Sequence, residues 1–509
     1  MDAPWWRSAV VYQIYPRSFC DSDGDGIGDL GGIIARLDHV EKLGVDAIWL
    51  SPIHRSPMAD SGYDVSDYTA VDPVFGDLDA FDRLLAGARR RGLRVVLDWV
   101  PNHTSSQHPW FLESRSSRTS PKREWYIWRD GRGEGPPNNW RSAFGGPAWT
   151  RDEATEQWYL HLFLPEQPDL NWASPEVVEA MHGTLRFWLD RGVDGFRADV
   201  VNLIGKDETL PDHRDELLHL DIATHHDHPR THELLRDIRG LLDEYEGDRV
   251  MIGEVPLDSP ESLAGYYGAG DELHTVFNFA LMHVPWSAEA FAKALVDAER
   301  ALTAPEAWPC WVLSNHDQPR HRTRFAASEE RARAAAVVIL TLRGTPFLFA
   351  GEEFGLLDAD VPFGSRVDPG GRDGSRAPIP WETAPPHGWP SPPWLPWPPE
   401  PGLRNAESEE ADSDSLLALY RRLLVTRRGS AALASGSWRL LAAPAGTLVY
   451  ERRCDDEVRL IAVNFTDEHL EGVDASDGWR IEVATHRRRE GRGWDGCLEP
   501  AEGVVLAPV

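Results

Sequence analysis

Cysteine, lysine and long apolar runs are all scarce in this 509-residue sequence. The four cysteines (Cys20, Cys310, Cys454 and Cys497) lie far apart, which excludes a disulfide framework and a cysteine-based zinc site. No apolar run approaches the length of a membrane span, and residues 1–7 lack the pattern of a signal peptide. We therefore expect a cytoplasmic protein without a membrane partner.

Positively charged residues are also few compared with negatively charged ones. The chain has 52 Lys and Arg against 82 Asp and Glu, a formal net charge of -30, and its lysines are Lys42, Lys122, Lys206 and Lys293 alone. An acidic chain repels nucleic acid, which argues against a nucleic-acid partner, whereas a neutral small molecule is indifferent to that charge. We expect a small-molecule ligand, a monomer or homodimer, and two or three domains, since the length exceeds one compact domain.

A pattern of helix, glycine and strand repeats along the chain. Ile33–Leu43 has the period of an amphipathic helix, stops at Gly44 and is followed by an apolar strand, Val45–Ser51. The same order recurs in helices Phe81–Arg91, Pro175–Arg191, His232–Tyr245 and Ser328–Leu342, with strands Leu93–Val100, Gly195–Val201, Val250–Glu254 and Thr345–Glu352. The strand Val10–Tyr15 and strands near 274–279 and 311–316 bring the predicted total to eight. Strands joined by helical crossovers run parallel.

Eight parallel strands alternating with helices predict an α/β fold, a (β/α)8 TIM barrel, with the active site at the carboxyl ends of the strands. An open doubly wound sheet shares this pattern, but no strand is followed by the glycine-rich loop that binds a nucleotide. We assign 1–103 and 171–430 to the barrel, Trp- and Pro-rich 104–170 to a small domain inserted after strand 3, and 431–509 to a C-terminal all-β sandwich. The Pro- and Trp-rich stretch 354–412 predicts a structured insertion over the barrel mouth.

Two charges interrupt the apolar strand at 195–201. Arg197 and Asp199 are two residues apart, so their side chains project to the same side. A guanidinium beside a buried carboxyl group favours the ionised form, and a fixed carboxylate in a cavity is suited to nucleophilic catalysis. A structural ion pair at a strand end would give the same local pattern.

An acidic loop lies between residues 21 and 29. Alternate acidic residues separated by glycine are typical of a loop that surrounds a hard cation with oxygen ligands. The loop resembles the start of an EF-hand, but a preceding strand and Gly32 at the twelfth position argue against that motif. The predicted ligands of a Ca²⁺ or Mg²⁺ ion are Asp21, Asp23, Asp25, the carbonyl of Ile27 and Asp29. An Asp/Gly turn without a metal is the alternative.

Five motifs in order along the chain resemble those of glycoside hydrolase family thirteen, the α-amylase superfamily. They are Asp98-Trp-Val-Pro-Asn-His103, Gln167-Pro-Asp-Leu-Asn171, Gly195-Phe-Arg-Ala-Asp199, Gly253-Glu254-Val255 and Asn315-His316-Asp317. The resemblance extends over essentially the whole chain. Within the superfamily, Met58–Asp64 and the Asp21–Asp29 loop are similar to the α-glucosidase and oligo-1,6-glucosidase branch.

The resemblance implies a role for each matching position. Asp199 is expected to be the nucleophile, Glu254 the acid/base, and Asp317 a third catalytic carboxylate that holds sugar hydroxyls. The implied substrate-binding residues are Asp60, Tyr63, His103, Phe163, Gln167, Arg197, His316 and Arg376. Asp60 and Arg376 would hold the non-reducing end, although the run Gly371–Trp381 around Arg376 departs from the usual sequence of that branch.

The activity implied is an exo-acting, retaining α-glucosidase that releases glucose from short α-glucosides, with a structural cation and no organic cofactor. A transglucosylase or sugar isomerase would share every catalytic residue and remains the main alternative. The residues after Asp317 read Gln-Pro-Arg-His-Arg-Thr-Arg, unlike the Arg-Leu-Asp-Arg-Asp signature of isomaltulose-forming relatives. A non-catalytic, transporter-associated relative is the other alternative, but those proteins carry a membrane helix and lack carboxylates that this chain keeps.

Overall fold

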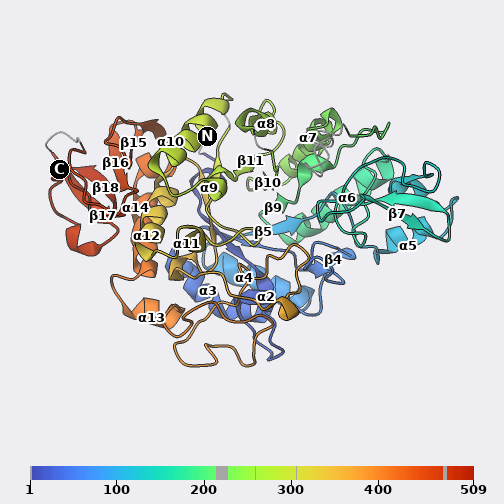
Figure 1. The fold of residues 1–509 in the computed structure, drawn as a ribbon, viewed down its shortest axis with the longest axis horizontal. Helices are drawn as coiled ribbons and strands as arrows, with labels where there is room; N and C mark the ends of the chain where they lie inside the picture. The colour runs from blue at the N-terminus through green and yellow to red at the C-terminus, as the bar shows by residue number, and fades with distance from the viewer. Residues whose placement is uncertain (1–2, 214–226, 258, 305–306, 474–477) are drawn as a thin grey trace.

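A computed structural model describes residues 3–213, 227–257, 259–304, 307–473 and 478–509. Eight strands close into a barrel at the centre of the molecule (Figure 1), and every neighbouring pair is parallel. In order around the barrel they are β1 (Val11–Ile14), β13 (Thr345–Phe349), β12 (Cys310–Val312), β11 (Thr275–Asn278), β10 (Val250–Gly253), β9 (Gly195–Ala198), β5 (Arg94–Trp99) and β2 (Ala47–Leu50). The predicted fold class is confirmed.

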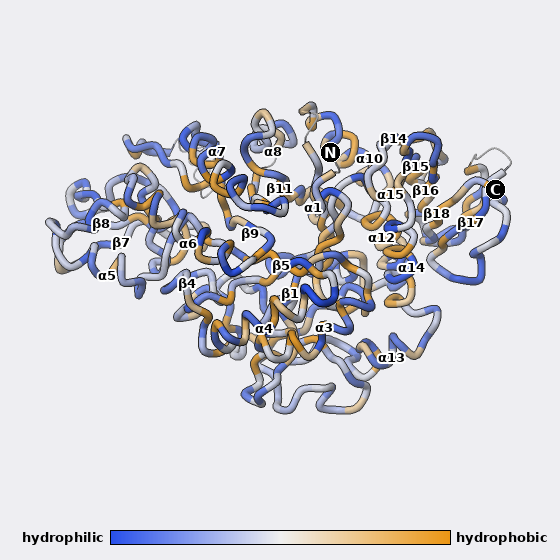
Figure 2. The backbone as a smooth tube through the Cα atoms, turned by 180° about the vertical axis from the view of Figure 1, so that it is seen from behind, coloured by the Kyte–Doolittle hydropathy of each residue, from blue (hydrophilic) through white to orange (hydrophobic). Residues whose placement is uncertain are grey.

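Side chains of the barrel strands are buried on both faces. One apolar cluster includes Trp49, Phe277 and Phe347 of the barrel strands, while a larger cluster lies between the strands and the surrounding helices. In Figure 2 the hydrophobic segments accordingly gather around the centre of the molecule. Burial on both faces is why the strands read as short apolar runs rather than as alternating patterns.

The barrel helices begin and end at identifiable residues. α3 (Leu30–Leu43) starts three residues before the predicted Ile33, because the Asp29 carboxylate caps it by accepting from the Gly32 N–H. Gly44 and Gly192 end α3 and α6 (Pro175–Arg191) with φ of 97° and 96°, a conformation that glycine adopts without strain. The other long helices are α4 (Leu78–Arg90), α7 (Pro229–Asp243), α10 (Ala288–Ala301), α12 (Glu329–Thr341) and α14 (Leu416–Gly429).

The segment after β5 leaves the barrel and forms a separate lobe, at the right of Figure 1. It contains α5 (Pro109–Arg115) and a three-stranded sheet in the order β6 (Trp128–Arg129), β8 (Gln157–Leu160), β7 (Trp149–Asp152). Isolated bridges pair His103 with Asp169 and Tyr126 with Leu170. The lobe therefore returns to the barrel beside the point where it left, which places its last residues at the barrel mouth.

The chain between β13 and α14 is largely irregular and contains only short helices, including α13 (Ala406–Ala411). It packs against the acidic loop near the N-terminus, because the Trp394 N–H donates to the Gly26 carbonyl at 2.9 Å and Ser391 Oγ to that of Gly24 at 2.6 Å. The same irregular segment carries Asp368, Arg372 and Arg376.

The C-terminal region forms one antiparallel sheet, at the left of Figure 1. Its order is β14 (Ser437–Leu440), β15 (Thr447–Cys454), β16 (Glu457–Asn464), β18 (Gly503–Pro508), β17 (Trp479–Ala484). The predicted all-β domain is present, but the described residues of 431–509 form one sheet and no second one, so the sandwich expected for this domain is corrected. The reason is that α12 and α14 cover one face, and a ribbon joined by the Leu470–Leu498 bridge covers the other.

Among the residues that the structure describes, no helix combines the length and the apolar character that crossing a membrane requires.

Candidate active site

A cavity of about 170 Å³ opens at the carboxyl ends of the barrel strands. Its lining comes from the barrel, the inserted lobe and the irregular segment after β13: Asp60, Tyr63, His103, Phe144, Phe163, Asp199, Val200, Glu254, Asp317 and Arg372. Seven of the residues expected at the site line it directly. Arg197, His316 and Gln167 lie behind this surface and contact the lining residues.

Arg197 joins the two expected catalytic carboxylates. Its Nη1 atom lies 2.6 Å from Asp199 Oδ1, and its Nη2 atom lies 2.6 Å from Glu254 Oε2. Nη1 also donates to Asp98 Oδ1 at 2.9 Å. Burial raises the pKa of Asp199 and the attraction of Arg197 opposes that shift. The strand geometry thus brings Asp199 and Glu254 to one side chain, as the spacing predicts for neighbouring strands.

Val200 has a left-handed backbone, with φ 35° and ψ 43°. This conformation is strained for a β-branched residue and concentrates at functional sites. It turns the Val200 N–H toward Glu254 Oε2 at 3.2 Å, so this oxygen receives two donors. Among the described residues no hydrogen bond occupies Glu254 Oε1 or Asp199 Oδ2, which leaves one oxygen of each carboxyl group for chemistry.

His316 and Tyr63 form the floor beneath Asp317. Their rings stack with centroids 5.4 Å apart, and the Tyr63 hydroxyl contacts both His316 Nε2 and Asp98 Oδ2. Burial lowers the pKa of His316 to about 3, so the imidazole is neutral at neutral pH. For Asp317, burial acts to raise the pKa, but the neighbouring His316, Arg372 and Arg376 outweigh it and hold the pKa well below its usual range. Asp317 is therefore an anion at neutral pH, as its expected role requires.

His103, Gln167 and Asp60 form a second polar group. Gln167 Nε2 lies 3.0 Å from His103 Nε2 and donates to Asp60 Oδ2 at 3.1 Å. Burial lowers the pKa of His103 to about 4, so it too is neutral. The ring of Phe163 lies 5.1 Å from that of His103 and gives the wall an apolar face.

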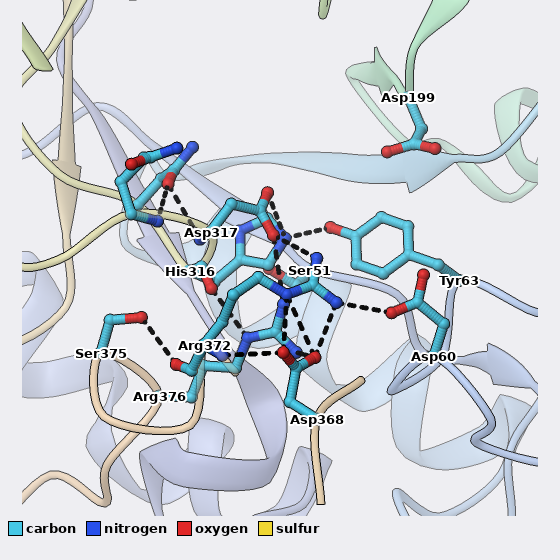
Figure 3. A network of polar contacts seen from close by, with 12 residues as sticks. Ser51, Asp60, Tyr63, Asp199, His316, Asp317, Asp368, Arg372, Ser375 and Arg376 are labelled. Carbon is cyan, nitrogen blue, oxygen red and sulfur yellow. Dashed lines mark hydrogen bonds and ion pairs between the residues drawn. The ribbon is translucent and has the colours of Figure 1, made fainter. Parts of the chain in front are cut away.

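Arg372, not Arg376, closes the cavity beside Asp60 (Figure 3), which corrects the expected assignment. Arg372 contacts Asp60 Oδ1 and Asp368 Oδ1 at 2.6 Å and Asp317 Oδ1 at 2.8 Å. Arg376 is 0% exposed and supports the site from below, donating to the His316 carbonyl at 2.7 Å and to Asp317 at 3.1 Å. Both arginines belong to one short run four residues apart, and only the path of the backbone decides which one reaches the cavity.

Several residues at or near the cavity could not be assigned to the site, or only weakly, from the sequence. Phe144 sits in the inserted lobe without a motif around it, and its ring packs near Phe163 and the guanidinium of Arg372. Asp98 was recognisable as a polar residue at the end of a strand. Lys206 is buried and pairs with Asp169 at 3.0 Å, and its position as one of four lysines was the available signal.

The acidic loop brings together carboxylate oxygens of Asp21, Asp23 and Asp29 within 4.8 Å of one another. This donor set fits a hard divalent cation. Asp25 lies outside the group, and its Oδ1 accepts from the Ile27 N–H at 2.8 Å. Asp21 also accepts from three backbone N–H groups of the loop, which gives its carboxylate a fixed position.

Comparison with known proteins identifies relatives along nearly the whole chain. A probable alpha-glucosidase of Rhizobium meliloti is 42% identical over 92% of this chain and 90% of its own length. An oligo-1,6-glucosidase of Parageobacillus thermoglucosidasius is 37% identical over 92% of each.

Two kinds of solved structure share the fold. The alpha-glucosyl transfer enzyme XgtA superimposes with a TM-score of 0.94 at 40% identity, over 100% of both chains. The trehalulose synthase MutB of Pseudomonas mesoacidophila MX-45 gives 0.93 at 34% identity, also over 100% of both. The family model described as alpha amylase, catalytic domain, matches residues 13–436. With its closed barrel and the carboxylates at the strand ends, this chain belongs to the α-amylase family of glycoside hydrolases.

Proposed function

We propose that this protein is an exo-acting, retaining α-glucosidase that releases glucose from the non-reducing end of short α-glucosides. The observation that carries the proposal is the pair Asp199 and Glu254, held on one guanidinium at the wall of a cavity that Arg372 and Asp60 close. Relatives named alpha-glucosidase and oligo-1,6-glucosidase support the same activity.

The reaction proceeds in two displacements. Asp199 attacks the anomeric carbon while Glu254 protonates the departing glycosidic oxygen, and a glucosyl ester forms. Glu254 then takes a proton from water as the water attacks that ester, so the anomeric configuration is restored. In this arrangement Asp199 Oδ2 is the attacking atom and Glu254 Oε1 carries the proton, since Arg197 holds the other oxygen of each group.

The closed end of the cavity defines an exo mode of attack. Arg372 spans Asp60, Asp317 and Asp368, so the wall beyond a single bound glucose consists of side chains locked together by ion pairs. Charge-assisted hydrogen bonds from this wall would hold the terminal 4-hydroxyl. A polymer cannot continue through it, which makes chain ends the substrate and starch a poor one.

Product analysis on maltose, isomaltose, sucrose, trehalose and starch tests the proposal. We expect glucose as the released sugar from short α-glucosides, and slow reaction with starch. Rapid release of internal oligosaccharides would contradict the exo mode. New glucosides or a rearranged disaccharide as the main product would instead favour a transglucosylase or an isomerase; the structural neighbours include an alpha-glucosyl transfer enzyme and a trehalulose synthase. The cytoplasmic location and the monomeric or dimeric state stay predictions.

Replacing Val200 with alanine should raise the ratio of maltose to isomaltose hydrolysis by about tenfold. Val200 follows Asp199 and lines the cavity, where its branched side chain crowds a second sugar attached directly and tolerates one held away by a methylene group. Rates on the two disaccharides measure the effect. Val201→Ala is the control, since Val201 is buried in the core and does not line the cavity. An unchanged ratio of maltose to isomaltose hydrolysis in Val200→Ala would show that Val200 does not set the linkage preference.

We also propose that the acidic loop holds one structural Ca²⁺ or Mg²⁺ through Asp21, Asp23 and Asp29, with Asp25 and the Ile27 carbonyl as further expected ligands. The convergence of the three carboxylates supports it, because like charges so close repel without a cation. Asp29 also caps α3, and the loop packs against 390–394, so a bound ion would stabilise both.

Chelation is therefore expected to lower the thermal unfolding temperature more than it lowers the rate of the enzyme that remains folded. Calorimetry with and without chelator, followed by Ca²⁺ or Mg²⁺ addition, measures this. Asp21→Asn should abolish the response to metal. Protein supplemented with metal that contains no bound ion and does not respond to chelator would refute the site.

A further inference from the structure

One guanidinium serves three buried carboxylates at the centre of the site. Arg197 contacts Asp98, Asp199 and Glu254 at 2.9, 2.6 and 2.6 Å, and its side chain is 1% exposed. The proposed reaction uses two of these groups, Asp199 and Glu254. It assigns nothing to Asp98, whose carboxylate does not line the cavity.

The other cationic side chains near Asp98, Asp199 and Glu254 form ion pairs with different carboxylates. Arg372 and Arg376 contact Asp317 and Asp368, and Arg372 also contacts Asp60. Lys206 pairs with Asp169. Within the part of the chain that the structure describes, Arg197 is thus the one cation in contact with Asp98, Asp199 and Glu254. If all three were ionised, the group of four would carry a net charge of -2 in a buried position.

The charge balance of the proposed reaction limits how many of the three carboxyl groups can be ionised at once. Before the first displacement Asp199 is anionic and Glu254 carries a proton; in the glucosyl ester Asp199 is neutral and Glu254 is anionic. The pair therefore holds one negative charge throughout, which Arg197 balances. Any charge on Asp98 would be an excess at every stage.

We propose that Asp98 works as a neutral carboxylic acid, a positioning residue that leaves the charge of Arg197 to Asp199 and Glu254. This inference rests on the proposed function. Asp98 is the member of the set with the least solvent to stabilise a negative charge, since its side chain is 0% exposed while Asp199 and Glu254 are 10% and 13% exposed at the cavity. Burial raises the pKa of Asp98 to about 7, against the attraction of Arg197, and it raises the pKa of Asp199 as well. The two groups therefore compete for one proton, and the proposed reaction requires the negative charge on Asp199.

A partner for that proton is in place. The Tyr63 hydroxyl lies 3.1 Å from Asp98 Oδ2 and also contacts His316 Nε2. In the structure the Tyr63 hydroxyl donates to Asp98 Oδ2, and Gln13 Nε2 lies 2.7 Å from His316 Nδ1, which leaves the proton of the neutral imidazole on Nε2. A proton on Asp98 Oδ2 reverses this chain: Asp98 donates to Tyr63, Tyr63 donates to His316 Nε2, and the imidazole proton moves to Nδ1, where the Gln13 amide turns its oxygen to accept it. The groups facing Asp98 are then Arg197, Asp199 and Glu254 on one side and this uncharged chain on the other, with Asp317 beyond it.

Two variants at the position separate charge from hydrogen bonding. Asp98→Asn keeps an acceptor for Arg197 and a donor for Tyr63, as the protonated acid would, whereas Asp98→Ala removes both. We expect Asp98→Ala to lower kcat/KM by about a hundredfold or more, and Asp98→Asn to recover most of that loss. The alkaline limb of the pH profile should move to higher pH in Asp98→Asn, because this side chain cannot ionise. An Asp98→Asn enzyme as impaired as Asp98→Ala, or a limb that moves to lower pH, would overturn the proposal.

Two measurements do not depend on glucosidase activity. Difference infrared spectroscopy of the wild-type protein at about pH 6 should show a protonated-carboxyl band that disappears in Asp98→Asn. Asp98→Asn should also keep or raise the unfolding temperature, while the control Asp169→Asn lowers it by leaving the buried Lys206 without a counter-charge. An identical infrared spectrum in Asp98→Asn would overturn the proposal even if the enzyme proved to be a glucosidase; a protein without glucosidase activity that shows the band would instead refute the function alone.

Discussion

Replacing Asp199 with alanine is expected to lower kcat by about four orders of magnitude or more while the protein stays folded. The loss follows because no other carboxylate is placed to form the glucosyl ester. The fold survives because Arg197 keeps Glu254 at 2.6 Å and Asp98 at 2.9 Å, so the truncation leaves no unpaired guanidinium. Steady-state rates and thermal unfolding of the same preparation measure both halves of the prediction.

A small anion distinguishes the roles of the two carboxylates. In Asp199→Ala, azide can enter the vacated space and should yield β-glucosyl azide from an α-glucoside with a good leaving group. In Glu254→Ala the nucleophile remains, so azide should attack the ester from the other face and give α-glucosyl azide. The wild-type enzyme should release α-glucose first, as NMR of early product would show. β-Glucose as the first product, or the same azide anomer from both variants, contradicts the assignment.

Replacing Arg372 with methionine is expected to lower kcat/KM on short glucosides by about a hundredfold to a thousandfold, or ~3–4 kcal/mol. Arg372 forms ion pairs with both Asp60 and Asp317 at the closed end of the cavity. Without its positive charge these two carboxylates repel one another and lose their positions. Its side chain is 19% exposed at the cavity, so the fold should tolerate the change. Kinetics on maltose and isomaltose provide the measurement.

Arg376 supplies the matched control, because it has the same chemistry in the same run and is fully buried. Arg376→Met should lower the unfolding temperature markedly, since it leaves the His316 carbonyl without its donor and removes one of the two guanidinium groups that contact Asp368. If Arg372→Met kept kcat/KM within about twofold of wild type, Arg372 would not close the substrate cavity.

Local sequence signals determined the barrel strands and the positions of the catalytic carboxylates. Helix-ending glycines such as Gly44 and Gly192 require a left-handed backbone, and the buried strands after them are nearly continuous apolar runs; both are local properties. Because parallel strands end at one edge, Asp199, Glu254 and Asp317 had to meet once the strands were recognised. The boundaries moved by a few residues where side chains cap helices, as Asp29 does for α3.

Other features depend on contacts between segments that are distant in the sequence. Arg372 and Arg376 are equivalent in sequence, and the course of an irregular segment after β13 alone places the first at the cavity and the second beneath it. The C-terminal strands showed their alternation, but whether a second sheet or helices α12 and α14 cover them depends on packing against the barrel. Likewise, the motifs give Asp98, Asp199 and Glu254 separately, whereas their sharing of one guanidinium exists only in the folded barrel. Local patterns fix elements because backbone conformation and burial are set by nearby residues; the pairing of charges across elements is set by distances that only the closed barrel establishes.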